Sequence, residues 1–333
     1  MSKVSQPVEG KPSDKPKQYF PGRSWMLIIG FELLAIVIIR NNHDTIRLLI
    51  NMFDEAVLNM VSTGLGVLAF FTFTRWFIWY SDYPVVTRRI AFWTCCVALA
   101  ALPFSVRLEG VTGNMVMKFQ WRWVKPKDAL LTSEGFKKEN LADLSEVSES
   151  DITGFLGNER NNYQTAPKLE KDWEANPPKL KWRQPIGAGW SAFVVVNGFA
   201  VTMEQRGDDE IVACYKAESG EPVWKYSVKS RHEHPLGGIG PRSTPTIYQG
   251  KVYSLGATGH LACLDGATGK PLWTKDLFQE QGIDQSTSEG IVLWGRAASC
   301  LIVDGKVVVP LGGVGENVVS LVAYDAVRPK TMA

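Results

Sequence analysis

The apolar residues of this 333-residue chain gather in three long runs before residue 107. The runs cover residues 25–39, about 56–73, and 90–106. Each approaches the ~17 residues that an α-helix needs to cross a bilayer. Aromatic residues stand at the ends of these runs, as in the aromatic belts of membrane proteins: Trp25, Trp76, Trp79 and Tyr80. The pattern predicts a membrane domain at residues 25–106 with about three transmembrane helices; two spans remain an alternative, because the first run is the shortest.

Basic residues in the short connections predict how these helices are oriented, because such residues favour the cytoplasmic side. The polar tail, residues 1–24, carries five Lys or Arg residues, and Arg88 and Arg89 lie between the second and third runs. We therefore expect a cytoplasmic N-terminus in a bacterial inner membrane and a periplasmic location for everything after residue 107. The first apolar run begins too late for a cleavable signal peptide, so the N-terminus is expected to be retained.

Two polar features lie inside the apolar runs. Glu32 is expected about one helical turn from the membrane interface, in a structural role with Arg75 as a candidate partner; a functional role is the alternative. Cys95 and Cys96 lie in the third run and are expected to pack there rather than to carry redox chemistry.

Residues 107–178 show no sustained apolar period and are expected to form a linker. Within it, residues 125–150 are charged and are expected to form one or two short helices, or to be disordered. Phe155 and Leu156 are an apolar island in this polar tract, and we expect them to dock the linker onto the domain that follows.

From residue 179 the pattern changes to short apolar strands separated by glycine turns, with four strands expected at residues 244–248, 251–255, 260–264 and 270–275. Four-stranded units that recur with a period of about 50 residues are typical of β-propeller blades. Three units align through their first turns, at Asn197-Gly198, Gln249-Gly250 and Asp304-Gly305.

Two segments of this region are nearly copies of each other. One runs from Ala213 through Gly220 to Trp224, and the other from Ala262 through Gly269 to Trp273. Ala323 is expected to take the place of Ala213 and Ala262 in a third unit, and Trp182, in an expected outer strand at residues 180–183, stands upstream of the first. Small residues let neighbouring units approach and Trp covers the seam between them, so all these residues are expected to be structural.

This repeat resembles the tryptophan-docking repeat of the PQQ-like β-propeller superfamily, which includes quinoprotein alcohol dehydrogenases and BamB-type lipoproteins of outer-membrane assembly. The chain is similar to membrane-anchored PQQ-like proteins of the planctomycete type, whose Phe-x-Gly-x-x-Arg entry motif is matched by Phe155, Gly157 and Arg160. The resemblance implies an N-terminal α-helical membrane segment followed by an all-β, partial β-propeller at residues 179–333. About two and a half of seven or eight blades are recognisable, so C-terminal truncation is expected.

Composition narrows the classes of function. A net charge of +2 gives no indication of nucleic-acid binding. The five Cys residues form no CxxC pair, and His232 and His234 lack a third ligand, so no metal site is predicted. The glycine-rich stretch 237–242 lacks the Lys-Ser/Thr of a phosphate-binding loop.

The resemblance places ligands near the central channel, where loops enter the innermost strands. The candidate ligand-binding residues, all polar or aromatic and outside the repeat, are Trp190, Arg206, His234, Arg242 and Arg296; His234 is expected on a long loop between blades. Trp190 aligns with Arg242, and Arg296 precedes the innermost strand of the third unit.

Two functions remain. The favoured one is a non-catalytic, membrane-anchored periplasmic scaffold that binds protein partners through its propeller, including a role in cell-envelope assembly. The alternative is a PQQ-dependent quinoprotein oxidoreductase, for which the resemblance implies PQQ and Ca²⁺ as cofactors. No catalytic base can be assigned from the sequence, and the adjacent-Cys ring of the family has no counterpart in the repeats because Cys95 and Cys96 lie in a span.

Overall fold

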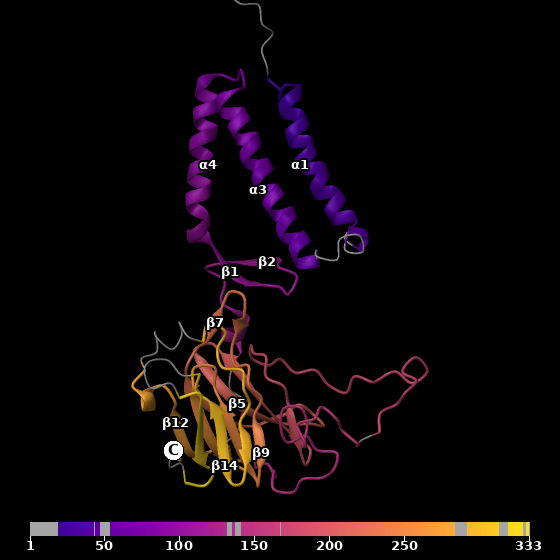
Figure 1. Ribbon diagram of the computed structural model, residues 1–333, viewed down its shortest axis with the longest axis vertical. Helices are drawn as coiled ribbons and strands as arrows, with labels where there is room; N and C mark the ends of the chain where they lie inside the picture. Colours follow the sequence, from indigo (N-terminus) through magenta and orange to yellow (C-terminus); the bar gives the residue numbers. More distant parts are fainter. Residues whose placement is uncertain are drawn as a thin grey trace, which may run out of the picture. The chain divides into compact units, whose positions relative to one another are not determined.

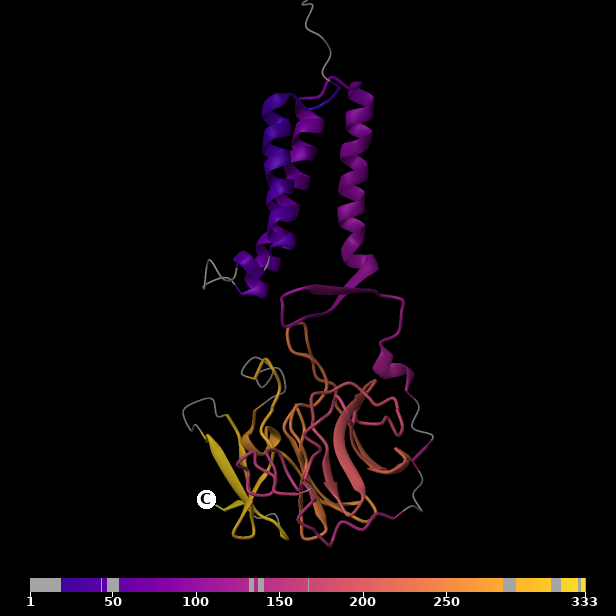
Figure 2. The same ribbon diagram turned by 90° about the vertical axis from the view of Figure 1, so that its right-hand side faces the viewer.

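The computed structural model describes residues 19–42, 44–46, 54–131, 135–136, 141–166, 168–283, 292–312, 319–328 and 331–332. The chain divides into two compact units, Met1–Arg122 and Trp123–Ala333. The first unit is helical and the second is built from β-sheets (Figures 1 and 2).

Three apolar helices form most of the first unit: α1 (Arg23–Asn41), α3 (Glu55–Trp79) and α4 (Val85–Ser105). All three are long and apolar enough to cross a membrane. Each begins before its predicted apolar run; α1 and α3 also end beyond theirs, whereas α4 ends at Ser105, one residue before the end of its run. Trp25 and Tyr80 meet with ring centroids 5.1 Å apart, so aromatic side chains do gather at one end of the α1–α3 pair.

Glu32 occupies a different place from the one predicted. It is the tenth of the 19 residues of α1, so it lies about 14 Å along the axis from either end rather than one turn from the interface. Its side chain is 6% exposed and accepts a hydrogen bond from the Thr72 hydroxyl of α3 at 3.3 Å. No ion pair joins it to Arg75 among the residues the structure describes.

A β-hairpin follows α4 directly, within the segment expected to be a linker. Its strands are β1 (Val106–Val111) and β2 (Met117–Trp121), paired antiparallel. The hydrophobic pattern did not predict these strands. Further along the expected linker, the described part of residues 125–150 holds one short 3-10 helix, η1 (Lys127–Leu130).

The second unit contains three four-stranded antiparallel sheets, each with its strands in sequence order. The first sheet consists of β3 (Val194–Val196), β4 (Phe199–Arg206), β5 (Asp209–Lys216) and β6 (Pro222–Lys229). The second consists of β9 (Thr246–Tyr248), β10 (Lys251–Leu255), β11 (His260–Asp265) and β12 (Pro271–Asp276). The third consists of β13 (Leu301–Val303), β14 (Lys306–Pro310), β15 (Leu321–Asp325) and β16 (Thr331–Met332). Three apolar helices followed by antiparallel sheets are consistent with the expected membrane segment and partial propeller.

The first turn of each sheet has the predicted glycine geometry. Asn197, Gln249 and Asp304 have φ of 48–49°, and the glycine after each has φ of 68–77°. Two consecutive residues at positive φ form the tight turn whose twist matches that of the flanking strands. Asn or Asp followed by Gly tolerates this geometry best, which is why the turns were visible in the sequence.

The alignment of the third unit was wrong by one residue. Lys306 pairs with Asp325 and Val308 with Ala323, whereas in the second sheet Lys251 pairs with Asp265 and Tyr253 with Cys263. Ala323 therefore takes the place of Cys263, and Val322 takes the place of Ala262. A shift of one residue moves a side chain to the opposite face of a strand, and it is Val322 that is buried against the second sheet.

The sheets pack face to face, with the innermost strands β3, β9 and β13 next to one another. One apolar core lies between the first and second sheets, around Val201, Trp224 and Leu264. A second lies between the second and third sheets, around Tyr253, Trp273 and Val309.

A Trp indole joins each sheet to the segment before it. The Trp182 Nε1 donates to the Ala217 carbonyl (3.0 Å), Trp224 donates to Gly266 (3.0 Å), and Trp273 donates to Ala326 (3.1 Å). Each acceptor is the residue that follows the third strand of its sheet. The expected outer strand at residues 180–183 is not formed, because its backbone has no ladder partner in the described part of the chain.

We call the second compact unit, Trp123–Ala333, the repeat unit. Replacing Gly269 by Ala should destabilise it more than the same change at Gly198. Both glycines have positive φ (68° and 77°), but a Cβ at Gly269 would overlap the Trp224 ring, whereas one at Gly198 would meet nothing within 4 Å. We expect Gly198→Ala to lower the free energy of unfolding by about 1 kcal/mol, and Gly269→Ala by about 2–4 kcal/mol. Urea titrations in detergent, followed by Trp fluorescence, measure both. Equal losses would show that the Trp224 contact is not tight.

Candidate functional site

A single segment, residues 151–160, crosses the innermost strands of all three sheets. Ile152 exchanges two backbone hydrogen bonds with Val195 of β3, each 2.8 Å. The Thr153 carbonyl accepts from the Ile247 amide of β9 (2.7 Å), and the Arg160 guanidinium donates to the carbonyl of Cys300, directly before β13. The linker therefore docks as expected, but through its backbone and Arg160.

Phe155 and Leu156 do not make this contact and remain 50% and 42% exposed. Leu156, Gly157 and Arg160 have φ of 68°, 85° and 52°, so the chain coils tightly and turns the two apolar side chains outward. Together with Ile152, Tyr163 and Phe193 they line a pocket of about 280 Å³.

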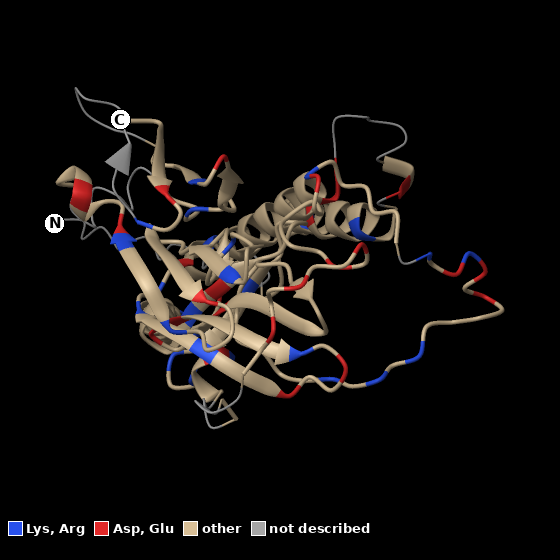
Figure 3. Ribbon diagram, turned by 90° about the horizontal axis from the view of Figure 1, so that it is seen from below, with Lys and Arg blue, Asp and Glu red and all other residues tan. Residues whose placement is uncertain are grey.

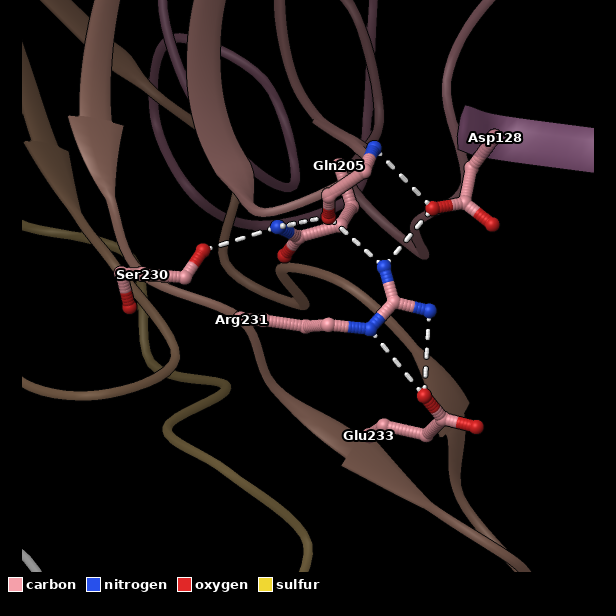
Figure 4. A network of polar contacts seen from close by, with 6 residues as sticks. Asp128, Gln205, Ser230, Arg231 and Glu233 are labelled. Carbon is pink, nitrogen blue, oxygen red and sulfur yellow. Dashed lines mark hydrogen bonds and ion pairs between the residues drawn. The ribbon is translucent and has the colours of Figure 1, made fainter. Parts of the chain in front are cut away.

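An ionic network holds the loops at the rim of the first sheet (Figure 4). The buried Asp128 carboxylate of η1 accepts from the Gly207 amide (3.1 Å) and from an Arg231 terminal nitrogen (2.8 Å). Arg231 also donates to Glu233 from two nitrogens at 3.0 and 3.1 Å. The Gln205 amide donates to the carbonyls of Gly207 and Ser230. The network fixes the start of β7 (Glu233–His234), which pairs with β8 (Gly238–Ile239) in a short hairpin.

Three of the five predicted ligand-binding residues come together around this β7–β8 hairpin. The Arg242 guanidinium donates to the Gly237 carbonyl and lies 5.9 Å from the centroid of the Trp190 ring. The His234 ring lies 4.8 Å from that of Trp294. We call Trp190, His234, Leu236, Arg242 and Trp294 the Trp–Arg patch. Trp190 is 66% exposed, Trp294 49% and Leu236 48%, and no acidic residue of the described chain forms an ion pair with Arg242.

The other two predicted residues lie elsewhere and have partners inside the fold. Arg206 pairs with the buried Glu204 carboxylate (3.1 Å) and donates to the Tyr215 hydroxyl. Arg296 is 5% exposed, donates to the carbonyls of Pro310 and Leu311, and lies 4.4 Å from the Phe278 ring centroid. These contacts indicate that both arginines stabilise loops.

No local pattern marks Asp128, since its partner Arg231 lies 103 residues further along the chain. Trp294 and Leu236 were also missed, because an exposed aromatic or aliphatic residue in a loop cannot be told from a buried one by pattern alone.

The residues of the Trp–Arg patch do not fit the calcium ion and carboxylate base that a PQQ enzyme requires. Calcium takes six to eight oxygen ligands, and the nearest carboxylate on the hairpin, Glu233, is bonded to Arg231. Among the described residues no group of three or more His, Cys, Asp or Glu could hold a metal ion. The residues of this patch therefore give no support for chemistry through PQQ.

A second polar site lies at the seam between the first and second sheets. The Glu210 carboxylate is 4% exposed and accepts a hydrogen bond from the Ala257 amide at 3.0 Å. Burial raises its pKa to about 7. Nearby, the Tyr226 hydroxyl lies 3.0 Å from Nε2 of His260, which faces a pocket of about 410 Å³. Burial lowers the pKa of His260.

Glu210 should make the repeat unit less stable as the pH rises. A carboxyl whose pKa is higher in the folded than in the unfolded state stabilises below the unfolded value, about 4.5, and this contribution is lost as the pH rises through 7. We expect a loss on the order of 3 kcal/mol between pH 4.5 and 8. Glu210→Gln should remove that slope in urea titrations across this range, whereas Glu218→Gln, at a side chain 81% exposed, should retain it. A Glu210→Gln variant that keeps the slope would contradict this assignment.

Residues 172–326 match a family model described as outer membrane protein assembly factor BamB. No curated protein matches the chain.

Solved structures with a similar chain trace include a quinohemoprotein alcohol dehydrogenase from Pseudomonas putida, with 21% identity, a TM-score of 0.31, and coverage of 45% of this chain and 20% of that one. A europium-containing methanol dehydrogenase shows 15% identity, a TM-score of 0.40, and coverage of 56% and 32%. BamB from Moraxella catarrhalis shows 18% identity, a TM-score of 0.22, and coverage of 44% and 47%. The chain thus spans between a fifth and a half of the length of these proteins. The family match supports a PQQ-like domain over residues 172–326.

Proposed function

We propose that this protein is a membrane-anchored binding module whose Trp–Arg patch recognises a partner protein. The observation that carries the proposal is the patch itself, in which exposed Trp190 lies beside Arg242 and exposed Trp294 beside His234. Trp and Arg are the residues most enriched at the energetic centres of protein interfaces. The partner expected here presents an acidic side chain beside apolar ones, because Arg242 has no carboxylate partner in the described chain.

The rigidity of the patch supports a binding role. The Asp128–Arg231–Glu233 network fixes one side of the β7–β8 hairpin, and the Trp190 amide donates to the Pro241 carbonyl at 2.8 Å. Side chains held in place before binding lose less entropy on association. The charges also differ between the patch and the rest of the repeat unit. Arg242 forms no ion pair with an acidic residue of the described chain, whereas basic and acidic residues are interspersed elsewhere (Figure 3). The match to a BamB-type family favours a partner in cell-envelope assembly over a substrate.

The three apolar helices would anchor this module in a bacterial inner membrane with a cytoplasmic N-terminus and a periplasmic repeat domain. The supporting feature is the excess of Lys and Arg in the tail and between the second and third helices. We also propose the planctomycete-type architecture that the Phe155, Gly157 and Arg160 motif resembles.

Photocrosslinking tests the binding role in membranes of the protein's own cell. A benzoyl-phenylalanine at Trp190 or Leu236 should give a discrete crosslinked species, whereas one at Leu272, which is 51% exposed on β12, should not. Arg242→Glu should reduce crosslinking at Trp190 about tenfold or more, since it opposes the partner's acidic group. Arg242→Lys should reduce it less.

Crosslinking at Leu272 to the same extent, or insensitivity of the crosslinking to Arg242→Glu, would contradict a specific binding surface.

The alternative function, a PQQ-dependent oxidoreductase, is tested by a separate assay. The purified protein with PQQ and Ca²⁺ is assayed for dye-linked alcohol oxidation, and PQQ-dependent dye reduction would overturn the binding-module proposal.

The orientation is tested by fusing alkaline phosphatase, which is active only in the periplasm, after residue 333. We expect an active fusion, and an inactive one when it is placed after Tyr83, between α3 and α4. The reverse pattern would place the repeat unit in the cytoplasm.

A further inference from the structure

The β1–β2 hairpin has one apolar and one polar face. Its cross-strand pairs Val106–Trp121, Leu108–Phe119 and Val111–Met117 lie on one face, because residues directly opposite each other share a face. Arg107–Gln120 and Gly110–Lys118 lie on the other face. A bulge between Leu108 and Gly110 inserts Glu109 as an extra residue, and this insertion brings Val111 onto the apolar face.

The apolar face is exposed in the described structure. Met117 is 54% exposed, Phe119 62%, Trp121 53% and Leu108 37%. A two-stranded hairpin is marginally stable in water unless its apolar face packs against something. The face therefore needs an apolar environment to cover it.

Hydrogen bonds tie the hairpin to two helix ends within the same unit. At its base, the Arg122 side chain donates to the Pro103 carbonyl (2.7 Å), and the Arg122 amide donates to Ser105 at the end of α4 (2.9 Å). At its tip, the Asn59 side chain near the start of α3 donates to the Asn114 carbonyl (2.9 Å). The hairpin thus lies across the ends of α3 and α4, crosswise to the helices (Figures 1 and 2).

We propose that this hairpin lies in the headgroup region of the bilayer that α4 crosses, with Leu108, Met117, Phe119 and Trp121 inserted into the boundary of the lipid chains. The inference rests on the membrane anchoring proposed above. Strand β1 begins at the residue after α4 ends, so the hairpin starts at the membrane surface.

The composition of the hairpin matches that location. Trp and Phe concentrate at bilayer interfaces, where amphipathic segments bury an apolar face among the lipids. Lys118 on the polar face can reach lipid phosphates. At the opposite ends of the helices, Trp25–Tyr80 and Tyr19–Tyr83 contacts already form an aromatic group. The hairpin supplies the aromatic residues of the second interface.

Site-directed spin labelling of the full chain in nanodiscs of phosphatidylcholine and phosphatidylglycerol tests the proposal. Cys95→Ala and Cys96→Ala remove the accessible thiols, and the remaining Cys214, Cys263 and Cys300 are each fully buried. Single cysteines then replace Phe119 and its neighbour Lys118, which lie on opposite faces. Met117 and Gln120 form a second matched pair, in case Phe119→Cys does not fold.

The readout is the ratio of label collision rates with oxygen, which concentrates in lipid, and with a water-soluble nickel complex. We expect this ratio to be about threefold or more higher at 119 than at 118, and at 117 than at 120. Equal ratios, or a label at 119 shielded from both reagents by protein, would overturn the proposal. A label at Leu99 of α4 separates the two proposals. If that label also lacks oxygen preference, the membrane anchoring itself fails; if only the hairpin labels lack it, anchoring stands and the inference falls.

Discussion

The hydrogen bond from a Trp indole to the backbone of the following sheet is the contact on which the repeat unit depends. A four-stranded sheet with an apolar face is not stable alone. Trp224 joins the first sheet to the second and Trp273 joins the second to the third, while Trp182 joins the segment 180–183 to the first sheet. Gly220 and Gly269 leave room for the indoles of Trp182 and Trp224. Truncating a buried Trp costs about 3–5 kcal/mol, which is a large share of the 5–15 kcal/mol that stabilises a typical domain.

This seam also determines which polar groups become functional candidates. Packing the sheets face to face brings the loops before β3 and β9 together, so Trp190 and Arg242 meet although 52 residues separate their positions. The same stacking buries Glu210 against the Ala257 amide and places residues 151–160 across three innermost strands. Trp190 and Trp294 are exposed because they lie outside the two apolar cores between neighbouring sheets.

Much of the fold was predictable because it is encoded locally. The turns, the strands of the second sheet and the seam tryptophans follow from short patterns of glycine and apolar residues. The third unit was aligned one residue out, since no glycine-and-Trp pair after Ala323 fixes the register. Strands β1 and β2 were missed although Met117–Trp121 alternates apolar and polar residues without a break; only β1 departs from alternation, at the bulge between Leu108 and Gly110. Glu32 was expected near one end of the helix although it is the middle residue of the apolar run 25–39 as well as of α1.

The sequence by itself determined the three apolar helices, the repeating antiparallel strands and the residues that join one sheet to the next. Their positions outside the repeat also made Trp190, His234 and Arg242 candidates for ligand binding, which is still a prediction. Only the tertiary structure decided that Arg206 and Arg296 have partners inside the fold while Arg242 has no carboxylate beside it in the described chain. The physical reason is that burial and charge pairing depend on side chains from distant parts of the chain, such as Asp128 and Arg231, and no local pattern records which of them will meet.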